Sequence, residues 1–517
     1  MSLSTGLLIL VSVITVAYYV LGRLFAHDPR EPPLAPQSIP FIGHVIGLSR
    51  SSFNYHVQLS KRVSSPIFTM VLPGQKMYVV TKPDLIQQVQ KLYKALSFAP
   101  IEAKFSTRIA GSSDKTKAIL KQSLKDHDNN VGLSADTQTA MRESTRPGAA
   151  LDEMNRVMIS EMARLLNDLQ PARGATRTFK MHAWLREAMT LATTRSAYGP
   201  KNPYDDKEIA DAFWVFEGGM MSILLGILPS ITARKPTAAR DKLAGAFEDY
   251  YRSGGVKTGS VLARRRYEVK IKNGLDIAEA ARFEAVNGLA ILVNTVPAAF
   301  WSLLMFHSDS TLLVDIRKEV DACTVSEDVS GTTTKTLDLN SLKEECPLLL
   351  SAYQEVLRYR AMGASIREVM EDTQLDNFLL KKGAMLQMPT RVLHEDKDIW
   401  GSTDFQPRRF LPENGKRQPR DDTFRAFGGG KTLCPGRHFA TNEIMAFTAL
   451  FIARFDMKPV KGSWELPTVA NTNAASAIME PDYDVDAEIT TRNGFEDVKW
   501  AIRLNASDRV YGMVTED

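Results

Sequence analysis

The chain has 517 residues, of which 44% are hydrophobic and 24% are charged, and its net charge is +4 at pH 7. The length is enough for one large domain or several small ones, and the composition is that of a globular protein. The small net charge and the lack of a long basic tail argue against nucleic-acid binding. Three cysteines in so long a chain exclude a disulfide framework and indicate a reducing compartment.

The N-terminus is strongly apolar. The run LLILVSVITVAYYVLG covers residues 7–22, and no charged side chain precedes Arg23. A membrane-spanning helix needs about 20 such residues. A cleaved signal peptide is the alternative, but signal peptides have a basic start and a shorter apolar run. We therefore predict a retained single-pass anchor over residues 1–25, with the rest of the chain in the cytosol because Arg23 and Arg30 follow the span.

The segment after the anchor is rich in proline. Residues 26–44 are predicted to form an extended spacer between membrane and domain. PIFTMVL (66–72) and QKMYVVT (75–81), which flank Pro73-Gly74, predict a β-hairpin. From about residue 84 helical patterns dominate. Within one of them, MMSILLGIL (220–228) is unusually apolar, which predicts a core helix or, alternatively, a surface that enters the membrane.

Residues 281–307 are the most apolar stretch after the anchor and predict a buried central helix. Pro297 should distort this helix and free a backbone carbonyl about one turn earlier. Short strands are expected over 364–390, and a hairpin is expected around Asn493-Gly494. We see no internal repeat and no linker. Residues 45–517 are therefore predicted to form one mainly α domain with a small β part.

A glycine-rich stretch with one cysteine, FRAFGGGKTLCPGRHFA, covers residues 424–440. A lone cysteine is more often a small buried hydrophobe than a ligand. The glycines allow tight bends, however, and a helix that starts near Arg437 would aim its amides at the sulfur of Cys434 and favour the thiolate. A zinc site needs three or four ligands, whereas one thiolate fits haem iron.

This stretch resembles the haem-binding loop of cytochromes P450, which has the pattern F-G-x-G-x-R-x-C-x-G. The resemblance makes Cys434 the axial ligand of haem b. Thr432 replaces the basic residue that commonly holds a haem propionate, and Lys431 lies beside it. The matching residues, implied to be cofactor-binding, are Phe427, Gly428, Gly430, Cys434 and Gly436.

Two further motifs follow the family order. Glu355 and Arg358 match E-x-x-R, and residues 405–410 match F-x-P-x-R-F with Arg409 as the second arginine. By itself the i, i+3 pair would more often be a solvated salt bridge. The resemblance implies instead a structural Glu–Arg–Arg cluster that fixes the loop of Cys434. With the anchor and the proline-rich segment, the resemblance covers essentially the whole chain.

The central helix departs from the common family pattern. Val293 and Asn294 stand where an acid–alcohol pair usually helps deliver protons to oxygen. The stretch NTVPAAFW (294–301) resembles the branch that contains sterol 7α-hydroxylases and prostacyclin synthase, which holds both hydroxylation and peroxide rearrangement. Asn294, with Thr295, is predicted to position oxygen or a substrate peroxide. The alternative is that Asn294 satisfies backbone freed by Pro297.

Arg367 lies in the strand region after the E-x-x-R helix, where family members often contact a haem propionate. A carboxylate-rich cofactor needs cationic partners, so we expect this contact, with a surface arginine as the alternative. His394 matches a common family segment, and its expected role is local hydrogen bonding.

The resemblance implies a monomeric haem-thiolate monooxygenase of the endoplasmic reticulum membrane. Electrons from NADPH would arrive through cytochrome P450 reductase, docked over the face of Cys434 near Arg425, Lys431 and Arg437. The expected substrate is an apolar polycyclic molecule such as a steroid, a terpenoid or a related secondary metabolite. One alternative is an isomerase or dehydratase that rearranges a peroxide without O2 or NADPH. Another is a non-catalytic haem-binding membrane protein.

Overall fold

The computed structural model describes residues 11–12, 15–16, 27–40, 42–126, 131–329, 332–411, 422–473 and 476–504. Most of the anchor predicted over residues 1–25 lies outside the described residues. The chain forms two compact units, and each is discontinuous in sequence. The first unit contains Met1–Phe98 and Ala364–Leu393, and the second contains Ala99–Gly363 and His394–Asp517.

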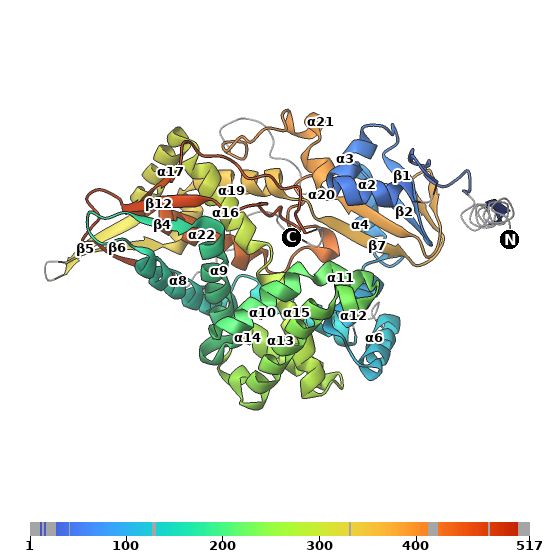
Figure 1. Cartoon of the computed structure of the whole chain (residues 1–517), viewed down its shortest axis with the longest axis horizontal. Coiled ribbons are helices and arrows are strands. Elements are labelled where there is room, and N and C mark those ends of the chain that lie inside the picture. The colour runs from blue at the N-terminus through green and yellow to red at the C-terminus, as the bar shows by residue number, and fades with distance from the viewer. Residues whose placement is uncertain are drawn as a thin grey trace, which may run out of the picture. The chain divides into compact units, whose positions relative to one another are not determined.

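The first unit is built on a five-stranded sheet. The strand order is β1 (Ile67–Leu72), β2 (Gln75–Val80), β10 (Met385–Pro389), β7 (Ala364–Val369) and β3 (Leu96–Ser97). Strands β1 and β2 confirm the predicted hairpin, because Leu72 pairs with Gln75 and Gly74 takes a positive φ of 74° in the turn. The unit also contains α2 (Gly43–Ser51), α3 (Asn54–Ser60), α4 (Pro83–Lys91), β8 (Thr373–Leu375) and β9 (Phe378–Leu380) (Figure 1).

Part of the proline-rich segment is docked on this sheet. The amide of Thr69 on β1 donates to the carbonyl of Pro33, and the amide of Ala35 donates to the carbonyl of Thr69. Prolines lack a donor, and so such a segment can pair only along one side, at the edge of a sheet. Glu31 is buried there with Lys76 and Tyr78, both of which hydrogen-bond to its carboxylate. The segment is thus only partly the extended spacer that was expected, because residues 29–30 form a turn and α2 already begins at Gly43.

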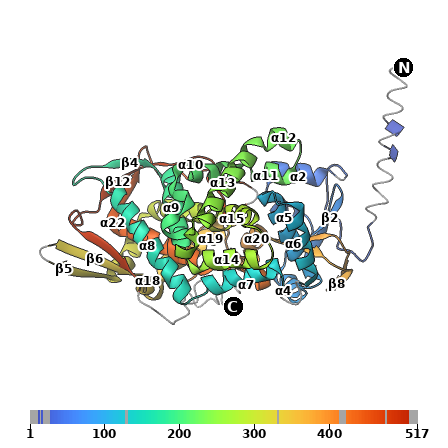
Figure 2. The same ribbon diagram turned by 90° about the horizontal axis from the view of Figure 1, so that it is seen from below.

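The second unit is mainly helical, as predicted. Figures 1 and 2 show its long helices packed against one another. Their buried apolar side chains form two core clusters. The helices are α5 (Ala99–Ala110), α6 (Asp114–Asp126), α7 (Leu133–Thr145), α8 (Ala149–Leu169), α9 (Met181–Tyr198), α10 (Lys207–Gly218), α11 (Met220–Leu225), α12 (Pro229–Thr232), α13 (Arg234–Arg252), α14 (Val261–Lys272), α15 (Ile277–Ile291), α16 (Thr295–His307), α17 (Ser310–Ala322), α18 (Leu339–Glu345), α19 (Pro347–Arg360), α21 (Lys397–Trp400) and α22 (Arg437–Arg454), with α20 (Thr390–His394) at the boundary between the units.

The predicted central helix is two helices. The stretch Ile277–His307 is long and apolar enough to cross a membrane, but 78% of its 18-residue apolar window is buried inside the protein, as in a core helix. It breaks between α15 and α16, and Pro297 lies in the first turn of α16. Since proline has no N–H, the helical hydrogen bond to the carbonyl of Val293 is lost. The predicted distortion is therefore confirmed, and it lies at Asn294.

The predicted C-terminal hairpin is wrong. Gly494 has a positive φ of 81° and a turn is present, but the flanking strands join different sheets. Strand β12 (Asp486–Thr491) lies between β11 (Phe455–Pro459) and β4 (Arg177–Lys180). Strand β13 (Lys499–Arg503) runs parallel to β6 (Thr332–Asp338), which also pairs with β5 (Thr324–Val329). The turn residues Asn493 and Gly494 specify that the chain reverses direction. They do not specify which strand each flanking strand pairs with.

The apolar stretch over 220–228 divides between the core and the surface. Met220 and Ile223 of α11 are buried, as a core helix requires. Between the last residue of α11 and the third residue of α12, four apolar side chains form an exposed patch. Their relative exposures are 62% for Leu225, 64% for Ile227, 66% for Leu228 and 75% for Ile231.

Candidate active site

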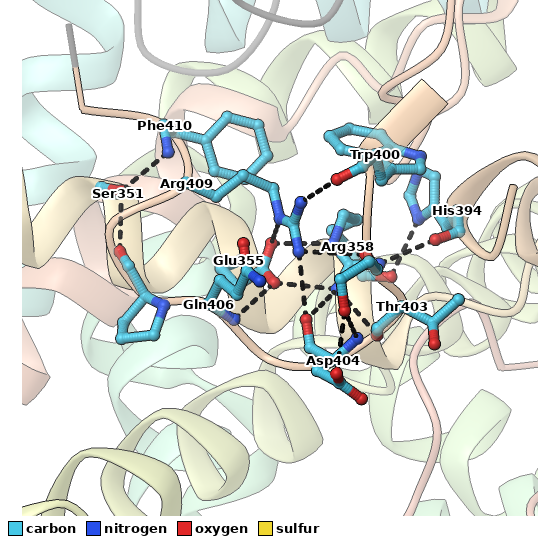
Figure 3. Close-up of polar contacts among 12 residues, drawn as sticks. Ser351, Glu355, Arg358, His394, Trp400, Thr403, Asp404, Gln406, Arg409 and Phe410 are labelled. Atoms are coloured by element: carbon cyan, nitrogen blue, oxygen red, sulfur yellow. Dashed lines mark hydrogen bonds and ion pairs between the residues drawn. The ribbon is translucent and has the colours of Figure 1, made fainter. Parts of the chain in front are cut away.

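The Glu–Arg–Arg cluster forms as the motifs suggested (Figure 3). Glu355 and Arg358 face each other on α19 with two contacts, Nε to Oε2 at 2.7 Å and Nη2 to Oε1 at 2.8 Å. Arg409, from the loop after α21, adds Nε to the same Oε2 at 3.0 Å. The amide of Gln406 donates to the Oε1 atom of Glu355 at 2.8 Å. One carboxylate therefore joins a helix to a loop more than fifty residues later in the chain.

The cluster is a buried charge network with an excess of one positive charge. Glu355 is fully buried and the Arg358 side chain is 1% exposed. The remaining guanidinium hydrogens go to backbone carbonyls, for example Arg358 Nη1 to the carbonyl of His394 at 2.7 Å and Arg409 Nη2 to that of Ser402 at 3.1 Å. Burial lowers the pKa of Arg409, although the charge of Glu355 acts in the opposite direction. Removing one partner of such a network leaves an uncompensated buried charge.

His394 connects this cluster to the cysteine loop. Its Nδ1 atom lies 3.0 Å from the carbonyl oxygen of Arg358, and its Nε2 atom lies 3.0 Å from the amide nitrogen of Arg425. A carbonyl can only accept and an amide can only donate, so Nδ1 carries the hydrogen and Nε2 is the acceptor. The ring stacks on Phe424 with the centroids 5.6 Å apart. His394 is thus a neutral link between α19 and the start of the loop, in line with the local hydrogen-bonding role expected for it.

The loop turns at two glycines. Gly428 has a φ of 80° and Gly430 a φ of 58°, conformations that side chains with a Cβ rarely adopt. The amide of Cys434 donates to the carbonyl of Phe427 at 2.9 Å and closes the loop. Gly436 differs from the expectation, because its φ of −84° is ordinary. A Cβ at Gly436 would lie 4.0 Å from the Sγ atom of Cys434, which is an ordinary van der Waals distance, so the protein by itself does not require glycine at this position.

The thiol of Cys434 lies at the N-terminus of α22 and is partly buried. Burial raises the pKa of Cys434, whereas the amide of Gly436, the charge of Arg437 and the amide of Arg437 act to lower it. The helix amides therefore point at the sulfur, as the sequence indicated. In the protein alone the effect of burial on the pKa of Cys434 is larger than that of the amides and of Arg437. A positively charged ligand at the sulfur would stabilise the thiolate.

Two residues near this loop were not predicted from the sequence. The hydroxyl of Thr145, the last residue of α7, lies 2.6 Å from the carbonyl oxygen of Pro435 and 2.8 Å from that of Met141, so its one hydrogen is shared between the two carbonyls. Glu443 lies on α22, fully buried, and its Oε1 atom accepts a hydrogen bond from the hydroxyl of Thr193 on α9. Burial raises the pKa of Glu443 to about 8. No short motif contains Thr145, but Glu443 is a charged residue among apolar ones and could have been noted on that ground.

Asn294 occupies the break between α15 and α16 and anchors a distant segment. Its Oδ1 atom accepts from the amides of Ala477 at 2.8 Å and Ile478 at 3.2 Å. Two backbone donors on one atom identify that atom as the oxygen, which leaves the Nδ2 hydrogens as the donors of the side chain. Asn294 therefore binds the backbone amides of residues 477 and 478. Among the described residues no contact joins it to the carbonyl freed by Pro297, so these hydrogen bonds differ from those of the alternative.

The anchored segment is further held by Met362, which follows α19, and by Trp301 in the middle of α16. The carbonyl of Ala477 accepts from the amide of Met362 at 2.8 Å, and that of Met479 accepts from Trp301 Nε1 at 2.7 Å. Thr295, the second residue predicted to be catalytic, donates from its hydroxyl to the carbonyl of Ile291 at 3.3 Å. Its side chain is thus turned back toward α15 and does not extend the polar group of Asn294.

Arg367 belongs to the first unit. It lies on β7, is 4% exposed, and donates from Nη1 to the carbonyl of Ile366 at 2.7 Å. Its guanidinium lies 5.9 Å from the centre of the Phe98 ring. Arg367 is thus not a surface arginine, and its contact with a haem propionate stays a prediction.

The donor set at the loop fits a haem. Among the described residues no group of three or more histidine, cysteine or acidic side chains could hold a metal ion, so a zinc-type site is not built there. Cys434 offers one soft donor, and two helix amides are directed at the sulfur. This arrangement suits an iron that takes its other ligands from a porphyrin.

Comparisons with known proteins agree with the geometry. The family model described as cytochrome P450 matches residues 32–249 and 292–485. Cytochrome P450 monooxygenase nodJ of Hypoxylon pulicicidum is 34% identical over 98% of this chain and 99% of its own length. Cytochrome P450 7B1 of Mus musculus is 25% identical over 88% of this chain and 89% of its own.

A solved structure shares the fold. The retinoic acid bound cyanobacterial CYP120A1 aligns with a TM-score of 0.66 at 18% identity, over 90% of this chain and all of that one. Together with the family model and the relative that matches nearly end to end, this confirms the fold class predicted from the motifs. The chain therefore belongs to the cytochrome P450 family and is a cytochrome P450 monooxygenase, an oxidoreductase whose family uses haem.

Proposed function

We propose that the enzyme holds haem b through Cys434 and oxidises an apolar polycyclic substrate with O2 and two electrons from NADPH. The observation that carries this proposal is the loop itself, in which a single thiol lies at a helix N-terminus on a backbone fixed by two left-handed glycines. When bound, haem supplies the activation of O2. The loop residues that would contact the cofactor beside the sulfur are Phe427, Gly428, Gly430 and Gly436.

The Glu355 cluster and His394 would keep this loop in place. Arg358 and Arg409 both hydrogen-bond to the carboxylate of Glu355. His394 hydrogen-bonds to the carbonyl of Arg358 through Nδ1 and to the amide of Arg425 through Nε2. Three residues after that amide, the first glycine turn begins. Because each partner is buried and directional, movement of the loop would expose unpaired polar groups. The cluster is proposed to act through position and not through contact with substrate.

Asn294 is proposed to orient the reacting oxygen or the substrate as a donor. Its Oδ1 atom is engaged by Ala477 and Ile478, so only Nδ2–H can point to a ligand. An amide does not exchange a proton as a carboxylic acid does, and Val293 occupies the usual acid position. This favours a role in binding over proton delivery. For Asn294→Ala we expect lost or uncoupled turnover, measured as product formed per NADPH consumed, whereas unchanged coupling would leave only the anchoring role.

The substrate class rests on the branch resemblance. The stretch 294–301 resembles the branch with sterol 7α-hydroxylases, and the relative named cytochrome P450 7B1 aligns over most of the chain. A steroid, a terpenoid or a related polycyclic metabolite is therefore the proposed substrate. The same branch and the missing acid favour a second candidate, a P450-type rearrangement of a peroxide. The third reading, a non-catalytic haem-binding membrane protein, has no such support.

We further propose a monomer on the endoplasmic reticulum membrane, with residues 1–25 as anchor, 26–44 as hinge and 45–517 as catalytic domain facing the cytosol. The exposed apolar patch Leu225–Ile231 supports a second membrane contact, because such patches mark interaction sites. A cytochrome P450 reductase is the proposed electron donor. Of the cations suggested for its docking, Lys431 is exposed, whereas Arg425 and Arg437 are buried, so their charges reach the surface only weakly.

Two experiments test the proposal. Reduced wild-type enzyme with CO should show the red-shifted Soret band of thiolate ligation, and Cys434→Ser should lose it, with Cys323→Ser as the matched control. Retention of the band in Cys434→Ser would refute the ligand assignment. Incubation with labelled O2, reductase and NADPH should then yield a product that is one labelled oxygen heavier than its precursor. An unlabelled product of equal mass would establish rearrangement instead.

A further inference from the structure

Two free cysteines that take no part in the proposed function lie against each other inside the second unit. Cys323 follows the last residue of α17, and Cys346 immediately precedes α19. Their Sγ atoms are 3.3 Å apart. Cys323 is 5% exposed and Cys346 is fully buried. The two thiols are therefore facing neighbours, separated by 23 positions in the sequence.

The surrounding contacts fix the two helix ends that carry these thiols. Glu319 of α17 caps α19, because its carboxylate accepts from the amide of Leu348 at 2.9 Å and from that of Leu349 at 3.0 Å. The thiol of Cys323 also lies 3.7 Å from the carbonyl oxygen of Ser341 on α18. Three helices thus meet at the pair, and the sulfurs cannot easily turn away from each other.

We propose that Cys323 and Cys346 are an oxidisable dithiol that forms a disulfide with a two-electron oxidant such as hydrogen peroxide. In the first step the sulfur of Cys323 attacks the peroxide, which gives a sulfenic acid and one water. The sulfur of Cys346 then attacks that sulfenic sulfur, so the S–S bond forms, the S–O bond breaks and a second water leaves. Each sulfur gives up one electron, and the peroxide takes both.

The order of attack follows from exposure and from the thiol contact. Cys323 is the less buried of the two, and so a small oxidant reaches it first. The hydrogen bond with Cys323, followed by burial, raises the pKa of Cys346 far above its ordinary value. Cys346 therefore stays protonated and is not the sulfur that attacks the oxidant first.

The bond would tie α17 to the helix of the Glu–Arg–Arg cluster. A disulfide needs a sulfur separation of about 2.05 Å, so the two Sγ atoms, now 3.3 Å apart, must approach each other by roughly 1.2 Å. The cross-link would enclose residues 323–346, which contain β5, β6 and α18. Glu355 and Arg358 lie near the other end of α19. Oxidation at Cys346 would therefore act, through α19, on the residues that hold the haem loop. The inference concerns covalent chemistry outside the active site and goes beyond the proposed function.

The test measures the bond itself in the intact holoenzyme. Reduced protein, freed of reductant, is treated with hydrogen peroxide and, in a parallel sample, with diamide, so that consumption of peroxide at the haem does not decide the result. Remaining thiols are blocked with N-ethylmaleimide in denaturant, and the unreduced digest is examined by mass spectrometry. Cys323→Ser and Cys346→Ser are the matched controls.

We expect a peptide pair linked through Cys323 and Cys346, 2 Da lighter than the sum of the reduced peptides and separated again by dithiothreitol. Neither single variant should yield it. Full blocking of both cysteines by N-ethylmaleimide after both oxidants would overturn the proposal. So would sulfinic or sulfonic acid at Cys323 with Cys346 still reduced, because the second sulfur would then have failed to reach the first.

Discussion

Glu443→Gln should change the pH dependence of stability. The Glu443 carboxyl is fully buried, its Oε1 atom accepts from Thr193, and Oε2 has no hydrogen-bond partner among the described residues. Burial raises the pKa of Glu443 from its ordinary value of 4.5 to about 8. At neutral pH the carboxyl is therefore protonated in the folded protein and ionised in the unfolded chain.

The sign and size of the effect follow from proton linkage. The folded protein holds the proton more tightly, so this stabilising contribution is complete below the unfolded pKa of 4.5 and is lost as pH rises through the folded pKa of about 8. Each pH unit in between costs about 1.4 kcal/mol. From about pH 6 to about pH 7.5 the free energy of unfolding should thus fall by about 2 kcal/mol more in wild type than in Glu443→Gln, which binds no proton.

Urea unfolding of the holoenzyme at the two pH values, followed by circular dichroism, measures this difference. Glu208→Gln is the matched control, because its side chain is 79% exposed and its ion pair with Lys242 is a surface contact of small energy. The control should follow wild type at both pH values. Parallel pH profiles for wild type and Glu443→Gln would refute the buried, protonated carboxyl.

The remaining predictions concern the frame of the haem loop. Glu355→Gln leaves Arg358 and Arg409 buried without a counter-charge and should cost about 3–5 kcal/mol of stability, with poor haem incorporation; a fully loaded variant with wild-type unfolding would contradict the structural role. Thr145→Val keeps the shape but removes the donor to the carbonyl of Pro435, which should cost about 1–3 kcal/mol. Urea unfolding and the rate of haem loss to apomyoglobin measure this effect, and values equal to wild type would show that the Thr145 hydrogen bond does not hold the loop.

The sequence predicted the parts of the site whose chemistry limits the choice of residue. Only glycine adopts the conformations at Gly428 and Gly430 without strain, and a buried carboxylate needs partners such as Arg358 and Arg409. Those constraints act within short stretches, and so they are visible as motifs. The mainly α fold and the break at Pro297 could be predicted for the same reason.

Long-range contacts could not be predicted in this way. The hydroxyl of Thr145 and the carbonyl of Pro435 are 290 positions apart, and neither residue type is unusual at its own site. The Oδ1 atom of Asn294 accepts hydrogen bonds from two amides that lie more than 180 positions away in the sequence. The turn at Gly494 was recognised, but its strands found partners in different sheets because strand propensity does not specify the neighbour.

The interrupted first unit has a consequence for how the protein is made. Strand β2 pairs with β1 at one edge, but its other edge is completed only by β10, in a parallel register from Met385 to Gln387. A ribosome adds roughly 5–20 residues each second, so the roughly 300 residues between these strands take about 15–60 s to synthesise. Throughout that interval the β1–β2 hairpin of the nascent chain leaves the backbone amides and carbonyls on the outer edge of β2 without a partner strand. The yield of active enzyme should therefore depend on chaperones that cover this edge, and slower translation in a foreign host should lower it.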